Sequence, residues 1–256
     1  MSLPTWTPDA LRSEAVPYAG KCWRVVEDQH AVATMDLVDS LEEQALLETI
    51  LEETKPTTPE ECRGLHYLLF TPFRYRNHEG SRFQLPGEGH GPFYAAEELR
   101  TALCEAAFWR MLVFAESPQT PWPARAPSYT AFSIPVRTDC ALDLTRPPLA
   151  GHAEHWQAPA DYNAWWQLAT AARAADIEAI RYQSVRDSQE GMNIALFTCR
   201  AFAAREPDER QAWLLWPGPH GVHVLRSTHP SQRFTLPPEH FAHDPRFDDM
   251  CWDRDE

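Results

Sequence analysis

Segments with strand patterns and segments with helix patterns follow one another along this chain without regular alternation. Runs rich in β-branched and aromatic residues predict short strands at 21–27, 65–70, 93–95, 129–136, 179–183 and 193–198, and a terminal hairpin from 213–216 and 222–225. Apolar residues at helical spacing predict helices at 37–51, 97–114 and 161–175. Because a doubly wound fold requires strands and helices to alternate, this order predicts an α+β fold with a mixed, mainly antiparallel sheet and flanking helices.

Size and apolar content predict one domain. A chain of 256 residues, of which 43% are hydrophobic, can bury a full core. It has no internal repeat and no low-complexity linker at which a domain boundary would be expected. We therefore expect residues 1–256 to form a single domain.

The net charge of −14 restricts the ligands that this chain can bind. Proteins that bind the phosphate backbone of nucleic acids need a basic face from which counterions are released. We therefore expect no direct nucleic-acid binding, and an anionic ligand would have to be held by a local cluster of arginines. No basic segment followed by an apolar stretch opens the chain, and no apolar run approaches the roughly 20 residues of a membrane span, which predicts a cytoplasmic protein.

The spacing of cysteines and histidines indicates neither a metal site nor a redox motif. The six cysteines, none in a Cys-x-x-Cys pair, stand at 22, 62, 104, 140, 199 and 251. They are expected to be buried, reduced thiols. Histidine pairs occur at 152 and 155, at 220 and 223, and at 240 and 243. None of these pairs has a suitable third ligand nearby, so no metal is expected.

Familiar nucleotide-binding and hydrolase signatures are absent. The sequence contains no Gly-x-Gly-x-x-Gly at the start of a helix, no phosphate loop ending in Gly-Lys-Ser/Thr, no His-Glu-x-x-His and no Gly-x-Ser-x-Gly. A dehydrogenase of the Rossmann type is therefore disfavoured.

Residues 80–110 contain an arginine, an aromatic hydroxyl and a carboxylate within one predicted strand-to-helix unit. Arg82 stands in the loop, Tyr94 in the short strand, and Glu105 between apolar neighbours of the helix. An arginine beside a carboxylate suits a ligand that is anionic at one end and becomes cationic at the other during reaction. Taken alone, each residue also has an ordinary structural interpretation as a loop anchor, a core tyrosine or a solvated glutamate.

Seven short sequence words occur in an order that resembles one protein family. They are Trp-Arg-Val at 23–25, Gly-Ser-Arg-Phe at 80–83, Phe-Tyr-Ala-Ala at 93–96, Thr-Ala-Leu-Cys-Glu at 101–105, Asp-Tyr at 161–162, Tyr-Gln-Ser-Val-Arg at 182–186 and Gly-Met-Asn-Ile-Ala-Leu-Phe at 191–197. The ordered set resembles the RES-domain family. On that resemblance, the chain is one RES-type domain with its core at about 20–202 and a C-terminal extension packed on the core.

The resemblance implies a fold related to ADP-ribosyltransferases and a toxin of a bacterial toxin–antitoxin module. Such toxins break the nicotinamide–ribose bond of NAD, often with phosphate as the acceptor, and are neutralised by a helix-turn-helix antitoxin of the Xre type. NAD would then be the substrate, with inorganic phosphate as an optional co-substrate and no cofactor. A homodimer within a hetero-oligomer with the antitoxin is a further expectation.

Matched by position, the resemblance assigns Arg24, Arg82, Tyr94 and Glu105 to the dinucleotide site, and Ser184 to the serine of the family's Ser-x-Arg word. We expect Glu105 to be catalytic, stabilising the oxocarbenium-like centre that forms as nicotinamide leaves, with Arg24 beside it. Arg24 and Arg82 offer the planar fork that suits pyrophosphate or phosphate. Tyr94 could stack on nicotinamide or bind a ribose hydroxyl.

The chain departs from the family pattern at several positions. Ser81, Phe83 and Gln84 stand where Gly, Trp and Asn are common. Asn163 stands where a serine or threonine often follows the tyrosine, and Trp166 where glutamine is frequent. Asn163 is kept as a candidate substrate-binding residue, while the hydroxyl or amide role of its helix stays open.

The sequence leaves three functions open. Water or phosphate could accept ADP-ribose, so that the protein depletes NAD. A protein side chain could be the acceptor, which would make the protein an ADP-ribosyltransferase. A non-catalytic module could use the same cleft to hold a nucleotide or a partner, but such a module would be expected to have lost the carboxylate or an arginine.

Overall fold

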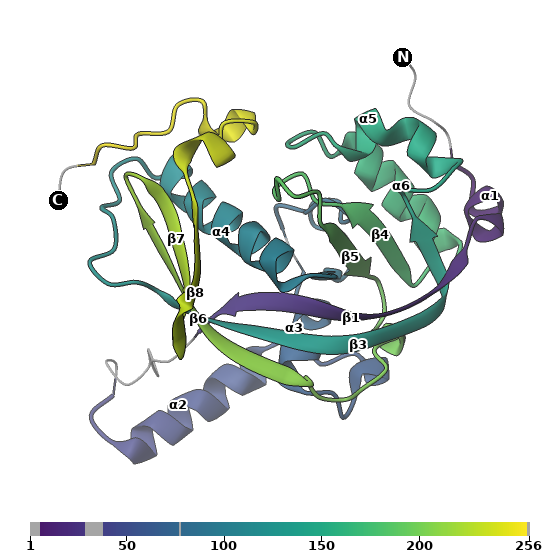
Figure 1. Cartoon of the computed structure of the whole chain (residues 1–256). Coiled ribbons are helices and arrows are strands. Elements are labelled where there is room, and N and C mark those ends of the chain that lie inside the picture. The colour runs from purple at the N-terminus through teal and green to yellow at the C-terminus, as the bar shows by residue number, and fades with distance from the viewer. Residues whose placement is uncertain (1–5, 29–37, 77, 255–256) are drawn as a thin grey trace.

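The computed structural model describes residues 6–28, 38–76 and 78–254, which form an eight-stranded sheet with helices packed around it (Figure 1). The strands are β1 Val16–Glu27, β2 Phe93–Ala96, β3 Ser128–Asp143, β4 Ala179–Gln183, β5 Met192–Leu196, β6 Glu209–Gly218, β7 Gly221–Arg226 and β8 His229–Leu236. The α-helices are α1 Pro8–Ser13, α2 Leu41–Thr54, α3 Tyr67–Arg74, α4 Leu99–Glu116, α5 Ala153–Trp156 and α6 Asn163–Ala174.

The sheet is mixed and mainly antiparallel, as the order of the segments predicts. Its strand order is β1-β2-β5-β4-β3-β6-β7-β8, and β1 also pairs with β3, so that the first five strands close into a ring. Among the strands of the described residues, only β3 and β4 are paired in parallel. The long strand β3 belongs to both parts of the sheet, because its first half pairs with β6 and its last residues pair with β4.

The terminal hairpin is confirmed, but it belongs to a three-stranded unit. β6 and β7 pair from Trp213 to Gly218, and β8 then pairs with β7. Residues 229–233 of β8 are all exposed, so the strand lacks the apolar alternation by which a half-buried strand is recognised.

Helix α4 confirms the helix predicted at 97–114 and supports one wall of the central cleft. Leu103, Ala107 and Met111 follow one another at four-residue steps and are at most 1% exposed. They pack in a core cluster that also contains Trp213 of β6 and Phe241 of the C-terminal segment. This packing on one side of the helix leaves Glu105 on a neighbouring side, toward the cleft.

The prediction of a strand at 65–70 is wrong, because helix α3 begins within these residues, at Tyr67. His66 caps the helix, since its Nδ1 accepts a hydrogen bond of 3.2 Å from the Leu68 backbone N–H. Leu69 and Phe73, four residues apart, are the buried side chains of the helix. A short apolar run does not separate a strand from a buried helical turn by its pattern alone.

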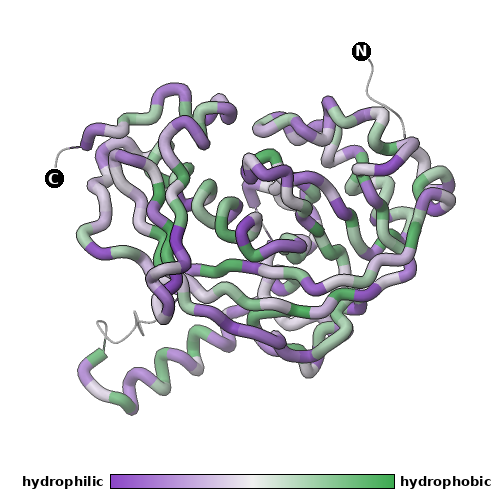
Figure 2. The backbone as a smooth tube through the Cα atoms, viewed as in Figure 1, coloured by the Kyte–Doolittle hydropathy of each residue, from purple (hydrophilic) through white to green (hydrophobic). Residues whose placement is uncertain are grey.

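Helix α2 begins at Leu41, and Leu37, which the predicted helix included, lies outside the described residues. The helix projects from the body of the molecule at the lower left of Figure 1, and Figure 2 shows apolar and polar segments alternating along it. Leu41, Leu46 and Ile50 are 75%, 60% and 48% exposed, so the apolar residues of α2 do not face the core.

The expectation of six buried, reduced thiols is wrong for four of the cysteines. Cys62 and Cys199 form a disulfide that joins segments 137 residues apart in the chain. Cys140 and Cys251 are exposed, while Cys22 and Cys104 are buried free thiols as expected. Two cysteines distant in sequence give no local signal of their pairing, because the fold alone brings them together.

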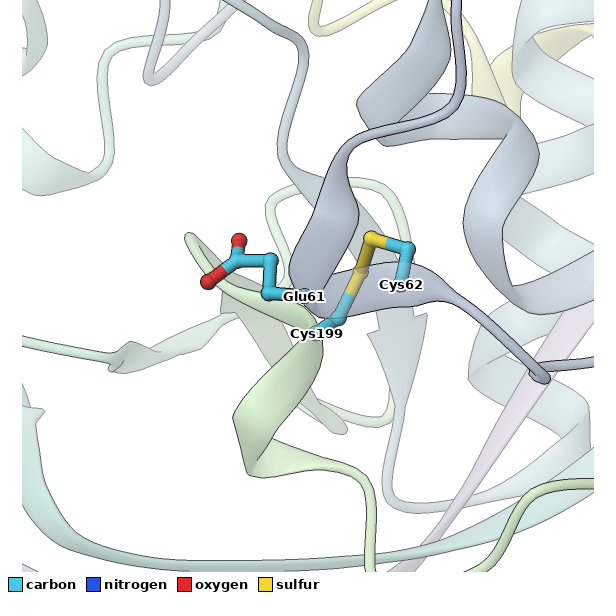
Figure 3. Close-up of side chains that lie close together, drawn as sticks. All are labelled: Glu61, Cys62 and Cys199. Carbon is cyan, nitrogen blue, oxygen red and sulfur yellow. A yellow bond between two sulfur atoms is a disulfide. The ribbon is translucent and has the colours of Figure 1, made fainter.

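Glu61, Cys62 and Cys199 form a group of potential metal-ligating residues, in which the Glu61 carboxylate points away from the disulfide (Figure 3). Metal binding uses cysteine thiolates, and here the two sulfur atoms are bonded to each other. Glu61 instead accepts a hydrogen bond of 3.1 Å from Thr198 Oγ1. No α-helix in the described ranges is long and apolar enough to span a membrane.

Candidate active site

A cleft of about 380 Å³ lies between the strand ring and α4. Its walls come from β1, the 79–82 loop, β2, α4, Tyr162, β4, Arg186 and β5, so it collects segments from most of the chain. Four of the six predicted site residues line it: Arg24, Arg82, Tyr94 and Glu105. Ser184 contacts Glu105 directly beneath the cleft surface, and Asn163 lies elsewhere.

Glu105 presents its carboxylate in the cleft, where three side chains donate to it. Oε1 accepts hydrogen bonds from Ser184 Oγ at 2.8 Å and from Asn193 Nδ2 at 2.6 Å. Oε2 accepts a hydrogen bond of 2.9 Å from Arg186 Nη1. Because these donors come from the turn at 184–186 and from β5, the orientation of the carboxylate is fixed before any ligand arrives.

The surroundings of Glu105 keep its carboxylate ionised. Burial alone would raise the pKa of this group, but the positive charges of Arg186 and Arg82 and the hydrogen bond from Ser184 outweigh it and lower the pKa. The Glu105 side chain is 19% exposed and that of Arg186 is 5% exposed. The site therefore holds a negative charge in a region from which most water is excluded.

Arg186 connects Glu105 to the other side of the cleft. Its Nη2 donates a hydrogen bond of 3.1 Å to the Tyr162 hydroxyl, and its guanidinium lies 4.1 Å from the centre of the Phe108 ring. The nearby charge of Glu105 raises the pKa of Arg186 in spite of its burial. Arg186 is the last residue of the sequence word Tyr-Gln-Ser-Val-Arg at 182–186. Only Ser184 of that word was assigned to the site from the sequence.

Ser184 has a positioning role under the cleft. Its hydroxyl donates to Glu105 and accepts hydrogen bonds from the backbone N–H groups of Arg186 and Asp187, at 3.1 and 3.2 Å. A serine that receives these backbone donors closes a tight turn. The same hydroxyl thus fixes the turn that carries Arg186 and orients Glu105.

Arg82 is buried without a polar partner. It is 5% exposed, and its Nη1 makes no hydrogen bond to any described part of the protein. Its guanidinium lies over aromatic rings instead, 4.5 Å from the centre of Trp165 and 5.3 Å from that of Tyr162. Burial and the like charge of Arg186 both lower the pKa of Arg82. Such a buried guanidinium, exposed only toward the cleft, would gain from an anionic ligand.

Arg24 is a second cationic group that lines the cleft. From the middle of β1 its Nη1 donates a hydrogen bond of 2.7 Å to the Tyr94 carbonyl oxygen, and its guanidinium lies 4.9 Å from the centre of the Phe93 ring. Burial lowers the pKa of Arg24 to about 10. No carboxylate in the described segments forms an ion pair with Arg24, so its charge is compensated only by a carbonyl dipole and a ring.

Tyr94 lines the cleft but uses its hydroxyl to hold the 81–83 loop. The hydroxyl shares a hydrogen bond of 2.8 Å with Ser81 Oγ and accepts one of 3.0 Å from the Phe83 backbone N–H. Ser81, one of the departures from the family pattern, thereby gains a partner. These two hydrogen bonds use two of the three donor and acceptor sites of the hydroxyl, so one site and the ring are left for the stacking or ribose-binding role considered for Tyr94.

Asn163 is not brought to the cleft. It is exposed at the start of α6, where its side-chain amide donates a hydrogen bond of 2.8 Å to Asp161 Oδ1. Trp166 of the same helix donates to the Ser81 carbonyl oxygen at 2.9 Å, so this helix supports the loop that carries Arg82. The amide at the site belongs instead to Asn193, whose Oδ1 is buried without a hydrogen-bond partner in the described chain.

A comparison with protein-family models agrees with the family suggested by the sequence words. A family model of the RES domain matches residues 58–217, more than half of the chain. Among the solved structures, one match is the crystal structure of the M. tuberculosis MbcT–MbcA toxin–antitoxin complex, with 15% identity, coverage of 84% of this chain and 95% of that chain, and a TM-score of 0.47. A search of curated proteins finds no match.

Proposed function

The chain belongs to the RES-domain family, and we propose that its cleft binds NAD and cleaves the nicotinamide–ribose bond. The protein would thereby act as a toxin that depletes cellular NAD. The observation that carries this proposal is the presence in one cleft of a buried guanidinium without a partner, Arg82, and a fixed, ionised carboxylate, Glu105. These groups suit the anionic part and the developing cationic part of one dinucleotide.

The pyrophosphate would be bound by Arg24 and Arg82. Both guanidiniums lack a carboxylate partner among the described residues, and a buried cation is costly without a counter-charge. A pyrophosphate would supply that charge and could accept hydrogen bonds from both forks. Arg186 is not available for this task, because Glu105 already neutralises it.

Glu105 would stabilise the ribose as the bond to nicotinamide breaks. A carboxylate has about four lone-pair sites, and the donors Ser184, Asn193 and Arg186 occupy three of them. One site on Oε2 is left to contact the substrate. The electrons of the breaking bond leave with nicotinamide, which becomes neutral, and positive charge develops at the ribose. Because nicotinamide is a good leaving group, no strong general acid is needed.

We propose inorganic phosphate or water as the acceptor of ADP-ribose, with no cofactor. A buried arginine with free donors, such as Arg82, supports an anionic acceptor as well as the pyrophosphate. Transfer to a protein side chain would give the same nicotinamide release and a different second product. The products therefore separate these reactions.

Control by a partner is part of the same proposal. We propose that a helix-turn-helix antitoxin of the Xre type neutralises this protein in the cytoplasm, within a hetero-oligomer that contains two copies of the toxin chain. The net charge of −14 supports a basic partner, because DNA binding by the assembly would need a basic face that this chain does not supply. A fold related to ADP-ribosyltransferases belongs to this proposal as well.

The test is to incubate purified protein with NAD and to quantify nicotinamide and the ADP-ribose product. Release of nicotinamide with ADP-ribose indicates water as the acceptor, and release with ADP-ribose 1″-phosphate in phosphate buffer indicates phosphate. Protein-linked ADP-ribose would instead identify a transferase. A folded protein that releases no nicotinamide under any of these conditions would refute NAD cleavage.

A further inference from the structure

The C-terminal segment after β8, which lies outside the residues that the family model matches, contacts a residue of the cleft wall. His240 Nε2 donates a hydrogen bond of 2.7 Å to the Arg186 carbonyl oxygen. Six residues later, the Arg246 guanidinium lies 5.1 Å from the centre of the Phe108 ring, over which Arg186 also lies. The segment therefore touches the arginine that holds the proposed catalytic carboxylate.

Arg246 joins this segment to the loop before α6. Its Nε and Nη2 donate hydrogen bonds of 2.8 and 2.6 Å to the two oxygens of Asp244, which is 4% exposed. Its Nη2 also donates a hydrogen bond of 3.1 Å to the Pro159 carbonyl oxygen. Figure 1 shows the C-terminal segment, in yellow, and the teal region before α6 approaching each other from opposite sides. Because a buried carboxylate fixes the guanidinium fork, Arg246 holds the loop at a defined distance.

The loop held by Arg246 leads directly to Tyr162 in the cleft wall. The Tyr162 hydroxyl accepts a hydrogen bond from Arg186, and Arg186 donates in turn to Glu105. Burial would raise the pKa of Tyr162, but the charges of Arg186, Arg82 and Arg246 lower it. Two of these three cations are paired with carboxylates, Arg186 with Glu105 and Arg246 with Asp244.

We propose that Arg246 is a positioning residue, which clamps the 157–162 loop so that Tyr162 holds Arg186 and, through it, Glu105 in the reactive orientation. The inference rests on the proposed function, because it concerns the placement of the same carboxylate. It adds a contribution from the C-terminal segment that lies beyond the matched residues. Arg246 does not touch the substrate and acts only through this chain of contacts.

The first test is a double-mutant cycle on the rate of nicotinamide release from NAD. Arg246→Gln should lower kcat roughly tenfold and change KM less, because a misplaced catalytic group affects the transition state more than ground-state binding. In a Tyr162→Phe background, the same substitution should lower kcat by less than about twofold, since the contact through which Arg246 acts is already lost. A full tenfold loss in both backgrounds would overturn the clamp.

Arg254→Gln is the matched control. Arg254 also lies in the C-terminal segment, but it donates to the carbonyl oxygens of Ser117 and Thr120 at 2.8 and 2.9 Å and lies over Trp122, beyond the end of α4. Its loss should lower thermal stability while leaving kcat within about twofold of wild type. An equal fall of kcat in Arg254→Gln would attribute the effect to general destabilisation and overturn the inference.

Hydrogen exchange gives a readout that does not depend on NAD cleavage. Arg246→Gln should speed amide exchange in residues 157–162, while Arg254→Gln should speed exchange only near the end of α4. If the wild type releases no nicotinamide, the proposed function fails, and the exchange measurement still decides whether Arg246 holds the loop. Unchanged exchange in 157–162 of Arg246→Gln would overturn the clamp whatever the turnover.

Discussion

The two sides of the cleft differ in how their charges are compensated. On the side of α4, Arg186 and Glu105 form an ion pair of 2.9 Å, and both receive further hydrogen-bond partners from the protein. On the side of β1 and the 79–82 loop, Arg24 and Arg82 have aromatic rings and one carbonyl oxygen as neighbours. The fold pairs the two charges of the first side with each other, whereas no described carboxylate forms an ion pair with either arginine of the second side.

Under the proposed function, this difference would separate two tasks of one site. A carboxylate that has to stabilise a developing charge must be fixed before the substrate arrives, so its donors belong to the protein. Guanidiniums that have to bind a phosphate must keep their donors free, and their burial strengthens the attraction to an anion. Loss of an arginine on the side of α4 should therefore lower mainly the stability of the fold. Loss of one on the side of β1 and the 79–82 loop should lower mainly the affinity for an anion.

The largest effect on stability is expected from breaking the ion pair between Arg186 and Glu105 on the side of α4. Arg186→Met leaves the Glu105 carboxylate without its counter-charge and should lower the free energy of unfolding by about 3 kcal/mol. Urea denaturation measures this change. Arg82→Met, with the same replacement on the other side of the cleft, is the control and should lose no more than about 1 kcal/mol. Equal losses in the two variants would contradict the comparison.

The second largest effect is expected from removing the charge of Glu105. Glu105→Gln keeps the shape of the side chain and should lower the turnover of NAD on the order of a hundredfold, the scale expected for a lost electrostatic stabiliser. Steady-state release of nicotinamide measures it. Glu116→Gln, on an exposed position of the same helix, should keep wild-type turnover. A folded Glu105→Gln protein with near-normal release would remove Glu105 from the mechanism.

The side of β1 and the 79–82 loop can be tested by removing the charge of Arg82. Arg82→Met should weaken the binding of NAD or phosphate roughly tenfold or more, because a charge-assisted contact is lost. Its free energy of unfolding should stay within about 1 kcal/mol of wild type or rise, since a buried charge without a partner is removed. Calorimetry with each ligand measures the affinities, and Arg63→Met, at an exposed arginine, is the control. Unchanged affinity for both ligands would make Arg82 a structural residue.

The smallest effect concerns pH. The pKa of Glu105 is lowered in the folded protein, so its ion pair stabilises the fold fully above the unfolded pKa of about 4.3. This contribution is lost as the pH falls through the lower, folded pKa. The difference in free energy of unfolding between wild type and Glu105→Gln should be constant from about pH 7 to 5 and shrink below about pH 4. A difference that begins to fall near neutral pH would contradict a lowered pKa.

Local sequence patterns predicted much of the framework around the site. Helix α4 follows from apolar residues at helical spacing, and β4 is predicted with its bounds at 179 and 183, because such periodicities are properties of short segments. The ordered words at 23–25, 80–83 and 101–105 placed Arg24, Arg82 and Glu105 in the site before any contact was known. All three line one cleft.

Contacts between distant segments could not be predicted in this way. The pattern at 65–70 fits a strand as well as a helix, and only the cap at His66 and the packing of Phe73 decide for the helix. Asn163 was chosen because it follows a tyrosine, but the amide at the carboxylate comes from Asn193 on β5.

The sequence by itself determined the family, the mixed sheet and three of the residues that carry the charges of the cleft, Arg24, Arg82 and Glu105. Tertiary structure decided which of those charges are paired. Glu105 and Arg186 are 81 residues apart, and they meet because the turn at Ser184 is carried against α4. Arg82 lines the same cleft and lies over aromatic rings, and no described carboxylate forms an ion pair with it. Whether a buried charge is compensated depends on neighbours that folding brings from other parts of the chain, and no local pattern records them.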